Sequence, residues 1–220
     1  MPTRTIAIGD IHGCAQEFEA LLQLLDVSPT DRIILLGDLI NRGPNSQRVL
    51  EIARRSGVIA LLGNHEFRLR EYRRTRDPSL LKKEDHDMLP QLRNVDWDFL
   101  ESMAITHYES DIDTVFVHGG FLPNRSWKDQ PAEIVTRIQV VDKQGHPRKR
   151  TDCPTCPSWA DLWKGPPQVV YGHTPRCDIH RTPWAIGIDT GCVMGGHLTA
   201  CILPEVKFVQ VRAHKVYHSA

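Results

Sequence analysis

The sequence lacks the features that mark several special classes of protein. No apolar run approaches the roughly 20 residues that span a bilayer, and the first residues contain no apolar core of a secretory signal. The 27 basic and 27 acidic residues balance to a formal net charge of zero, which argues against non-specific binding to nucleic acid or anionic membranes. We therefore expect a cytoplasmic protein with no membrane partner.

Cysteine is also scarce. Six cysteines in 220 residues are too few for a disulfide scaffold, and in a reducing compartment they are expected to be thiols. Cys153 and Cys156 have half the spacing of a zinc ribbon, but no second pair follows. Three interpretations stay open for them: a structural zinc site, a redox pair, or a proline-kinked loop with two thiols. The neighbouring basic run 148–150 either collects a polyanionic substrate or lies in solvent.

What is present is typical of a globular enzyme. The chain is 40% hydrophobic and 25% charged, as in an average folded domain. Its length predicts one domain over residues 1–220. Residues 66–104 are charged and mostly helical by composition, with breaks at Pro78 and Pro90, so we expect a helical insertion there.

Apolar runs predict the strands. In the first half they alternate with helical patterns, notably Phe18, Leu21, Leu22 and Leu25 at helical spacing. Continuous apolar strands joined by helices are typical of a parallel sheet that is buried on both faces. We expect the late strands 184–188, 198–203 and 207–211 to form a second sheet. The earlier expected strands cover residues 5–8, 33–36, 58–62, 114–117 and 168–171.

Each of the five earlier strands is followed by a side chain that can bind a metal ion. A single Asp in such a place is usually a turn former, and a single His is usually packed or exposed. The same succession occurs five times here, which favours a common site at the carboxyl ends of the strands. The side chains are Asp10 and His12, Asp38, Asn64 and His65, His118, and His173.

Carboxylate, imidazole and amide ligands together suit Mn, Fe or Zn better than Ca. Such a set can hold two ions if one carboxylate bridges them. Two adjacent cations can activate a shared water and clamp a phosphoryl oxygen. The pattern therefore favours a dimetal site for phosphoryl chemistry.

These blocks resemble the calcineurin-like metallophosphoesterase superfamily, and within it the phosphoprotein-phosphatase branch. Segments 159–165 and 187–199 are similar to the ApaH-like phosphatases, which are relatives of bacterial diadenosine tetraphosphatase. The resemblance implies an α/β fold, a four-layer αββα sandwich in which helices flank two mixed sheets. The matching blocks are Gly9-Asp-Ile-His-Gly13, Gly37-Asp-Leu-Ile-Asn-Arg-Gly43, Gly63-Asn-His-Glu66, His118-Gly-Gly and Gly172-His-Thr.

The resemblance also implies a role for each site residue. Asp10 and His12 are expected to bind one metal ion, and Asp38 to bridge both. The second ion is expected to be bound by Asn64, His118 and His173.

The same resemblance implies two catalytic residues. His65 is expected over the leaving-group oxygen as a general acid, and Arg42 on the substrate phosphate, where a guanidinium can make a bidentate contact. Arg137 is either a second phosphate contact or a surface charge.

One residue departs from the pattern of the protein phosphatases. They carry Asp where this chain has Asn41, and that Asp orients the catalytic His and raises its basicity. Asn41 can orient His65, and we include it with Arg42 and Arg137 among the substrate-binding candidates. Glu66 and Asp161 are the candidates for supplying the missing charge.

The expected function is that of a dimetal phosphohydrolase, with Mn as the first choice of metal and Fe or Zn as alternatives. The expected reaction is symmetrical cleavage of diadenosine tetraphosphate by in-line attack of a metal-bridging hydroxide. Alternatives are a Ser/Thr or broad phosphoprotein phosphatase, a polyphosphatase, an RNA nucleotide-cap hydrolase, and a binding scaffold without activity. Partners are therefore nucleotides or phosphorylated molecules, with capped RNA as the one nucleic acid. The sequence makes no prediction of oligomeric state. Trp159 and Trp163 either stack on a base or pack in the core.

Overall fold

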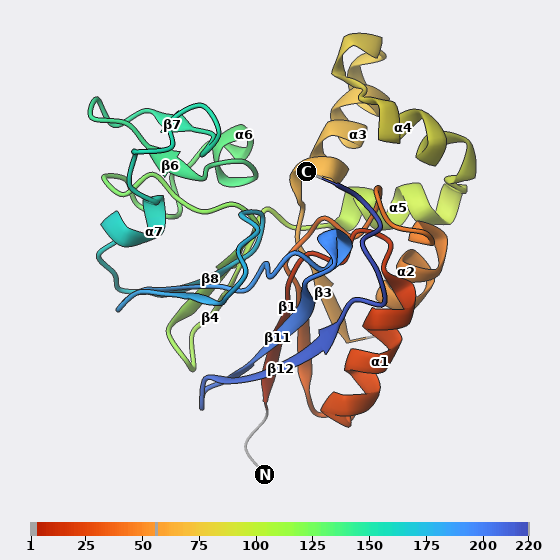
Figure 1. Cartoon of the computed structure of the whole chain (residues 1–220), viewed down its shortest axis with the longest axis horizontal. Helices are drawn as coiled ribbons and strands as arrows, with labels where there is room; N and C mark the ends of the chain where they lie inside the picture. The colour runs from red at the N-terminus through yellow and green to blue at the C-terminus, as the bar shows by residue number, and fades with distance from the viewer. Residues whose placement is uncertain (1–3, 56, 220) are drawn as a thin grey trace.

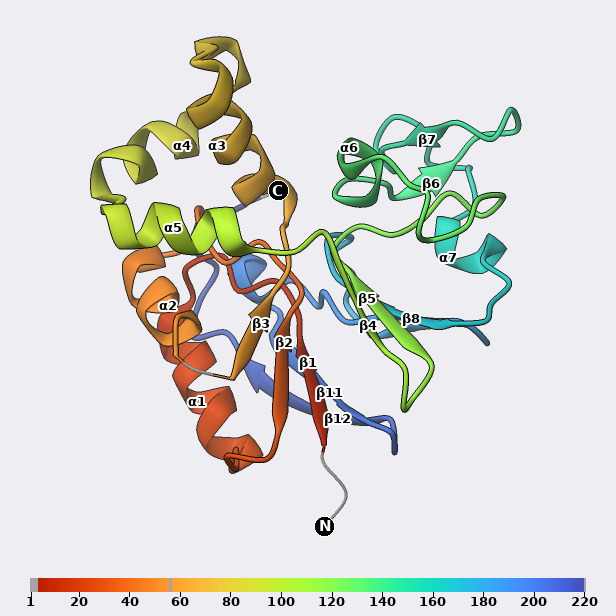
Figure 2. The same ribbon diagram turned by 180° about the vertical axis from the view of Figure 1, so that it is seen from behind.

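A computed structural model describes residues 4–55 and 57–219 of the chain. Two five-stranded mixed sheets pack face to face, and helices cover their outer faces (Figures 1 and 2). The predicted α/β sandwich of two mixed sheets flanked by helices is therefore confirmed.

The first sheet has the strand order β12-β11-β1-β2-β3. Its parallel part is β1 to β3, with α1 and α2 as the connections, as the alternation of apolar runs and helical stripes predicts. The elements are β1 (Thr5–Ile8), α1 (Ala15–Leu25), β2 (Arg32–Leu35), α2 (Ser46–Ala53), β3 (Val58–Ala60), β11 (His197–Leu203) and β12 (Lys207–Arg212).

The prediction that the last two strands belong to a second sheet is wrong. β11 pairs antiparallel with β1, so that Ile6 faces Ile202, and β12 extends the same sheet as a hairpin. An apolar run shows that a strand is buried, but it does not show which strand is its neighbour.

The second sheet has the order β4-β5-β8-β10-β9. β5, β8 and β10 are parallel, and β4 and β9 close the two edges in antiparallel pairing. The elements are β4 (Thr106–Glu109), β5 (Thr114–Val117), β8 (Gln168–Tyr171), β9 (His180–Arg181) and β10 (Ala185–Gly187).

The core has three apolar clusters, one at each interface between layers. Ile6 and Ile8 point toward the helices on the first sheet, whereas Ala7 points toward the second sheet. Val115 and Phe116 alternate in the same way in β5. This period of two is the strand geometry that lets one strand line two cores.

Two further groups of helices lie on opposite sides of the molecule in Figure 2, one on the left and one on the right. Between β3 and β4 the chain is almost wholly helical, and a smaller lobe between β5 and β8 includes the short β6–β7 ladder. Every helix in the described ranges is too short or too polar to cross a bilayer. The elements are α3 (Asn64–Thr75), η1 (Pro78–Leu80), α4 (Lys83–Met88), η2 (Leu89–Gln91), α5 (Asn94–Ser102), α6 (Ala132–Val135), β6 (Val140–Val141), β7 (Pro147–Arg148), α7 (Trp159–Leu162) and η3 (Cys192–Met194).

Two open interpretations are resolved in the smaller lobe. Trp159 and Trp163 are buried in the cluster behind the second sheet, so they are core residues. Cys153 and Cys156 form a disulfide, so the expectation that they are thiols is wrong, and neither sulfur is free to bind zinc. Their Cα atoms are 5.4 Å apart because the intervening Pro-Thr makes a tight turn, a separation that suits a disulfide.

Candidate metal centre

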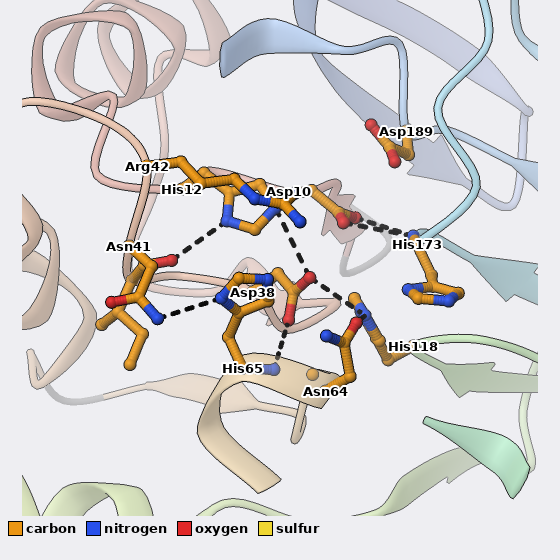
Figure 3. A network of polar contacts seen from close by, with 12 residues as sticks. Asp10, His12, Asp38, Asn41, Arg42, Asn64, His65, His118, His173 and Asp189 are labelled. Carbon is orange, nitrogen blue, oxygen red and sulfur yellow. Dashed lines mark hydrogen bonds and ion pairs between the residues drawn. The ribbon is translucent and has the colours of Figure 1, made fainter. Parts of the chain in front are cut away.

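The predicted ligands come together where the carboxyl ends of the two sheets meet (Figure 3). Asp38 lies at the middle of the group. Its Oδ2 is 3.4 Å from His12 Nε2 and 3.4 Å from His118 Nε2. His118 Nε2 is also 3.4 Å from Asn64 Oδ1, and the Asp10 carboxylate accepts the His173 backbone N–H at 3.0 and 3.2 Å.

Two groups of potential ligand atoms share Asp38. One contains His12, Asp38 and His65, the other contains Asp38, His118 and His173, and within each group the atoms lie within 4.8 Å of one another. Two adjacent groups that share one carboxylate are the arrangement that two bridged cations require. The residues therefore fit a dimetal centre.

Three imidazoles have one ring nitrogen fixed by a backbone carbonyl. His12 Nδ1 donates to Ile40 O at 3.0 Å, and His118 Nδ1 donates to Leu36 O at 2.8 Å. His173 Nε2 donates to Arg137 O at 3.0 Å. In His12 and His173 the other nitrogen is left as an acceptor facing the cluster, which is how proteins orient metal-binding histidines. In His118, against the opposing effect of burial, Asp38 and Asp10 raise the pKa to about 10.

The backbone around the cluster is strained. Nine non-glycine residues in the described ranges have positive φ, and five of them are site residues. Residues with such conformations are concentrated at functional sites, where the surrounding contacts hold the backbone in place. A Cβ on Gly172 would also collide with the Asp10 carboxylate, so the close approach of strand end and carboxylate requires glycine there. The five are His12, Asp38, Asn41, Arg42 and His173.

Burial and mutual attraction set the charges of the ligands. Burial lowers the pKa of His12 to about 4 and that of His173 to about 3, so both rings are neutral at pH 7, as a metal ligand must be. Burial opposes the charge on Asp38, but His118 and His65 hold the pKa of its carboxyl well below the usual value. Burial and Asp189 raise the pKa of Asp10. Buried carboxylates this close together favour the binding of cations, which would compensate their negative charge.

Glu66 supports the loop that carries Asp38. Its carboxylate accepts four backbone N–H groups: Asp38 at 2.9 Å, Leu39 at 2.8 Å, Ile40 at 3.2 Å and Gly63 at 3.1 Å. Glu66 is fully buried. Its role is therefore to fix the turn after β2. Among the described residues, Glu66 makes no hydrogen bond to the His65 side chain.

The buried carboxylate that contacts Asn41 is Asp85 on α4, and Arg68 compensates its charge. Asn41 Nδ2 is 3.0 Å from His65 Nδ1 and 2.7 Å from Asp85 Oδ1, and Arg68 pairs with the same carboxylate. Neither Glu66 nor Asp161 supplies the negative charge expected beside His65. Glu66 bonds to the backbone, and Asp161 pairs with His180 Nε2 at 3.1 Å. The expectation for Glu66 and Asp161 is therefore wrong.

A cavity of about 510 Å³ opens beside the ligands. Arg42 lines it, with one guanidinium nitrogen 3.1 Å from His12 Nε2. Arg137 follows α6 and also lines the cavity, with its guanidinium 5.6 Å from the Phe67 ring. Five cationic side chains line this cavity: Arg42, Arg68, Lys82, Arg137 and Lys149.

The fold and the cluster together define a class of protein. Two stacked mixed sheets that hold a carboxylate-bridged group of imidazoles beside a cationic cavity are suited to metal-dependent hydrolysis of phosphate esters. The family model described as calcineurin-like phosphoesterase matches residues 3–214, so the chain belongs to this family and is a metal-dependent phosphoesterase.

Individual relatives are similar along almost their whole length. The chain is 28% identical to the symmetrical bis(5'-nucleosyl)-tetraphosphatase of Nitrosomonas europaea, covering 94% of this chain and 97% of that protein. It is 30% identical to the asymmetrical bis(5'-nucleosyl)-tetraphosphatase PrpE of Bacillus thuringiensis, with 93% and 92% covered. A solved putative diadenosine tetraphosphatase superposes with a TM-score of 0.85 at 28% identity, covering 96% of this chain and 94% of that one.

Sequence reasoning missed three residues of the site, Arg68, Asp85 and Asp189, and gave a fourth, Glu66, the wrong role. Glu66 lies in the Gly63-Asn-His-Glu66 block, but its backbone contacts are visible only in three dimensions. Arg68 and Asp85 meet across 17 residues of a helical insertion, and no motif marks that pairing. Asp189 lines the cavity, and burial raises its pKa to about 6. The resemblance of segment 187–199 was the available signal for it.

Proposed function

We propose that this phosphoesterase hydrolyses dinucleoside polyphosphates, with symmetrical cleavage of diadenosine tetraphosphate as the predicted reaction. The observation that carries the proposal is the set of five cations around one cavity beside the ligand cluster, of which Arg68 is paired with Asp85 and the other four can face a substrate. A phosphomonoester carries about two negative charges, which would leave about two of these four cations unpaired. A chain of four phosphates matches them better.

The positions of the cations also support a chain that runs through the site. Arg68 and Lys82 come from the helical segment on one side, whereas Arg137 and Lys149 come from the smaller lobe on the other (Figure 1). Partial desolvation and the nearby charges, Arg68 first, lower the pKa of Lys82, so these cations share one field. Phosphates on both sides of the scissile bond would relieve that repulsion, as they would in either symmetrical or asymmetrical cleavage of a dinucleoside tetraphosphate.

A pair of divalent cations, manganese in our proposal, would supply activated water and charge neutralisation at the phosphoryl group when bound. Asp10, His12, Asp38, Asn64, His118 and His173 are the proposed ligands. Arg42 is proposed to hold the phosphate that is cleaved, because its guanidinium lies next to His12 at the cavity. His65 is proposed to face the leaving-group oxygen. Asn41 acts on His65 in this scheme, and substrate contact by Arg137 fits its place in the cavity.

The test compares products and substrates with the manganese-loaded enzyme. Diadenosine tetraphosphate, p-nitrophenyl phosphate and a phosphoserine peptide are each supplied at the same concentration. We expect the highest kcat/KM for the dinucleotide and ADP as the sole product. ATP plus AMP would show asymmetrical cleavage. Faster turnover of the phosphopeptide would replace the proposal with a protein phosphatase, and no turnover would leave a binding scaffold.

A matched pair of variants separates polyphosphate recognition from the chemistry. Lys82→Ala and Lys149→Ala remove cations from opposite walls of the cavity. Each is expected to raise KM for diadenosine tetraphosphate about tenfold, the equivalent of one charge-assisted contact, and to leave p-nitrophenyl phosphate hydrolysis unchanged. Equal effects on both substrates would contradict the proposal. Polyphosphate and capped RNA are further substrates for the same comparison, and a cytoplasmic location remains a prediction.

A further inference from the structure

His65 differs from the other histidines of the site in what faces its ring. The ligand imidazoles donate one N–H to a backbone carbonyl, but His65 Nδ1 faces two donors. Asn41 Nδ2 is 3.0 Å away, and the Arg68 guanidinium nitrogen is 3.3 Å away. A guanidinium has no acceptor, so Nδ1 must be the acceptor in that contact.

Asp85 fixes the direction of the Asn41 amide. Its Oδ1 lies 2.7 Å from Asn41 Nδ2, and a carboxylate oxygen requires the NH2 side of the amide there. The second hydrogen of the same NH2 group then points to His65 Nδ1. Turning the amide over would bring two oxygens together, so Asp85 excludes that orientation.

Asp85 is itself held firmly. Arg68 pairs with it through Nε at 2.5 Å and through a terminal nitrogen at 2.8 Å, and the backbone N–H of Lys82 donates to it at 2.8 Å. Asp85 is fully buried, and Arg68 and Asn41 are each 4% exposed. The arrangement is thus a closed set of buried partners, which allows few alternatives.

We propose that Asp85, through Asn41 and Arg68, is a positioning residue that holds His65 in the tautomer with its proton on Nε2. A neutral ring whose Nδ1 is an acceptor carries its proton on Nε2. His65 Nε2 is buried and has no hydrogen-bond partner among the described residues. It therefore presents an N–H to the site and cannot be a metal ligand, although it belongs to one of the two groups of potential ligand atoms.

The consequence concerns the leaving group and rests on the proposed position of His65. A phosphoanhydride releases a nucleoside diphosphate, which is a stable anion. A hydrogen bond from Nε2–H to the departing oxygen stabilises the charge that develops on it, and no proton has to leave His65. The Asp of the protein phosphatases can only accept a hydrogen bond from the catalytic His when it is ionised. Asn41, which stands in its place, instead donates one to His65 Nδ1.

The direct test is the tautomer of His65 in the wild-type chain. The enzyme is loaded with zinc, labelled with 15N in its histidines and measured by NMR. The His65→Gln variant lacks the His65 signals, so a comparison with the wild type identifies them. We expect an unprotonated Nδ1 and a protonated Nε2. A protonated Nδ1 would overturn the proposal, and this result does not depend on any substrate.

The second test uses a matched pair of buried carboxylates. Asp85 and Asp96 are both fully buried, both accept the backbone N–H that begins their helix, and both pair with arginine. Asp96 lies on α5 and, among the described residues, makes no hydrogen bond to Asn41 or His65. Asp85→Ala and Asp96→Ala therefore lose comparable structure, but only Asp85→Ala frees the Asn41 amide to turn.

The readout is the ratio of kcat for phenyl phosphate to kcat for p-nitrophenyl phosphate, which differ in leaving-group basicity. We expect Asp85→Ala to lower this ratio about tenfold, the equivalent of one hydrogen bond in the transition state, and Asp96→Ala to leave it unchanged. Equal ratios in the two variants would refute the positioning role. Wild-type activity on both esters without cleavage of diadenosine tetraphosphate would sink the proposed substrate and leave this inference standing.

Discussion

The buried carboxylate of Glu66 provides a demanding prediction, because its role was invisible in the sequence. Each of its oxygens accepts two backbone N–H groups, Oε1 from Leu39 and Ile40, and Oε2 from Asp38 and Gly63. Glu66→Gln keeps the shape of the side chain but replaces one oxygen with an NH2 group. Two hydrogen bonds are lost, and the new NH2 group faces two buried backbone N–H groups that are also donors.

The magnitude follows from these contacts. Burial and Asp38 raise the pKa of Glu66 to about 7, so the carboxylate is fully charged only above that pH. There a hydrogen bond to a charged group contributes about 1.5–3 kcal/mol, so two of them amount to about 3–6 kcal/mol. That is a large part of the roughly 5–15 kcal/mol by which a domain is stable. The same bonds hold Asp38 at a positive φ of 49°. We therefore expect weaker metal binding together with the lower free energy of unfolding.

Urea unfolding of the metal-free chain measures the first effect, and titration with manganese measures the second. Glu71→Gln is the matched control, because Glu71 is on the same helix α3 but pairs at the surface with Arg74. An exposed pair contributes less than about 1 kcal/mol. If the free energies of unfolding of the two variants agree within about 1 kcal/mol, the reasoning about Glu66 is refuted.

Three further predictions follow from single contacts. Arg42→Lys should lower kcat/KM about 10- to 100-fold at unchanged metal content, because an ammonium cannot make the bidentate contact; an unchanged kcat/KM would remove Arg42 from the phosphate site. His65→Ala should lower kcat by about two orders of magnitude with both metals retained, as steady-state kinetics and metal analysis would show. The hydrogen bond from Arg4 lowers the pKa of Asp31 from 3.8 to about 2, so this pair stabilises the fold above pH 3.8 and the effect is lost as the pH falls toward 2. Asp31→Asn should therefore cost roughly 1 kcal/mol in urea unfolding at pH 7 and nothing at pH 2, and an equal cost at both pH values would contradict the assignment.

The ligands could be predicted from the sequence because each follows a buried strand. Asp10 after β1 and His118 after β5 are 108 residues apart and belong to different sheets, yet the carboxyl ends of the parallel strands of both sheets face the same site (Figure 3). The regular geometry of the sheets thus converts a pattern in the chain into a position in space.

The surroundings of the ligands could not be predicted in this way. Asp85 reaches Asn41 across 44 residues of sequence, and the packing of the helical segment that carries Asp85 has no period in the sequence. The pairing of β11 with β1 failed for a related reason, since a buried strand does not specify its neighbour. Contacts that depend on how whole elements pack need the three-dimensional structure.

The central claim is that six side chains of this chain hold two cations through one shared carboxylate. The metal content of the manganese-loaded, desalted protein tests it most directly, measured by mass spectrometry for the wild type, Asp38→Asn and the surface control Asp161→Asn. The account predicts about two ions per chain in the wild type and the control, and fewer than about one in Asp38→Asn, because Asp38 Oδ2 lies 3.4 Å from both His12 Nε2 and His118 Nε2 and so faces both proposed ion positions. Two ions retained in Asp38→Asn, or no more than one in the wild type, would contradict it.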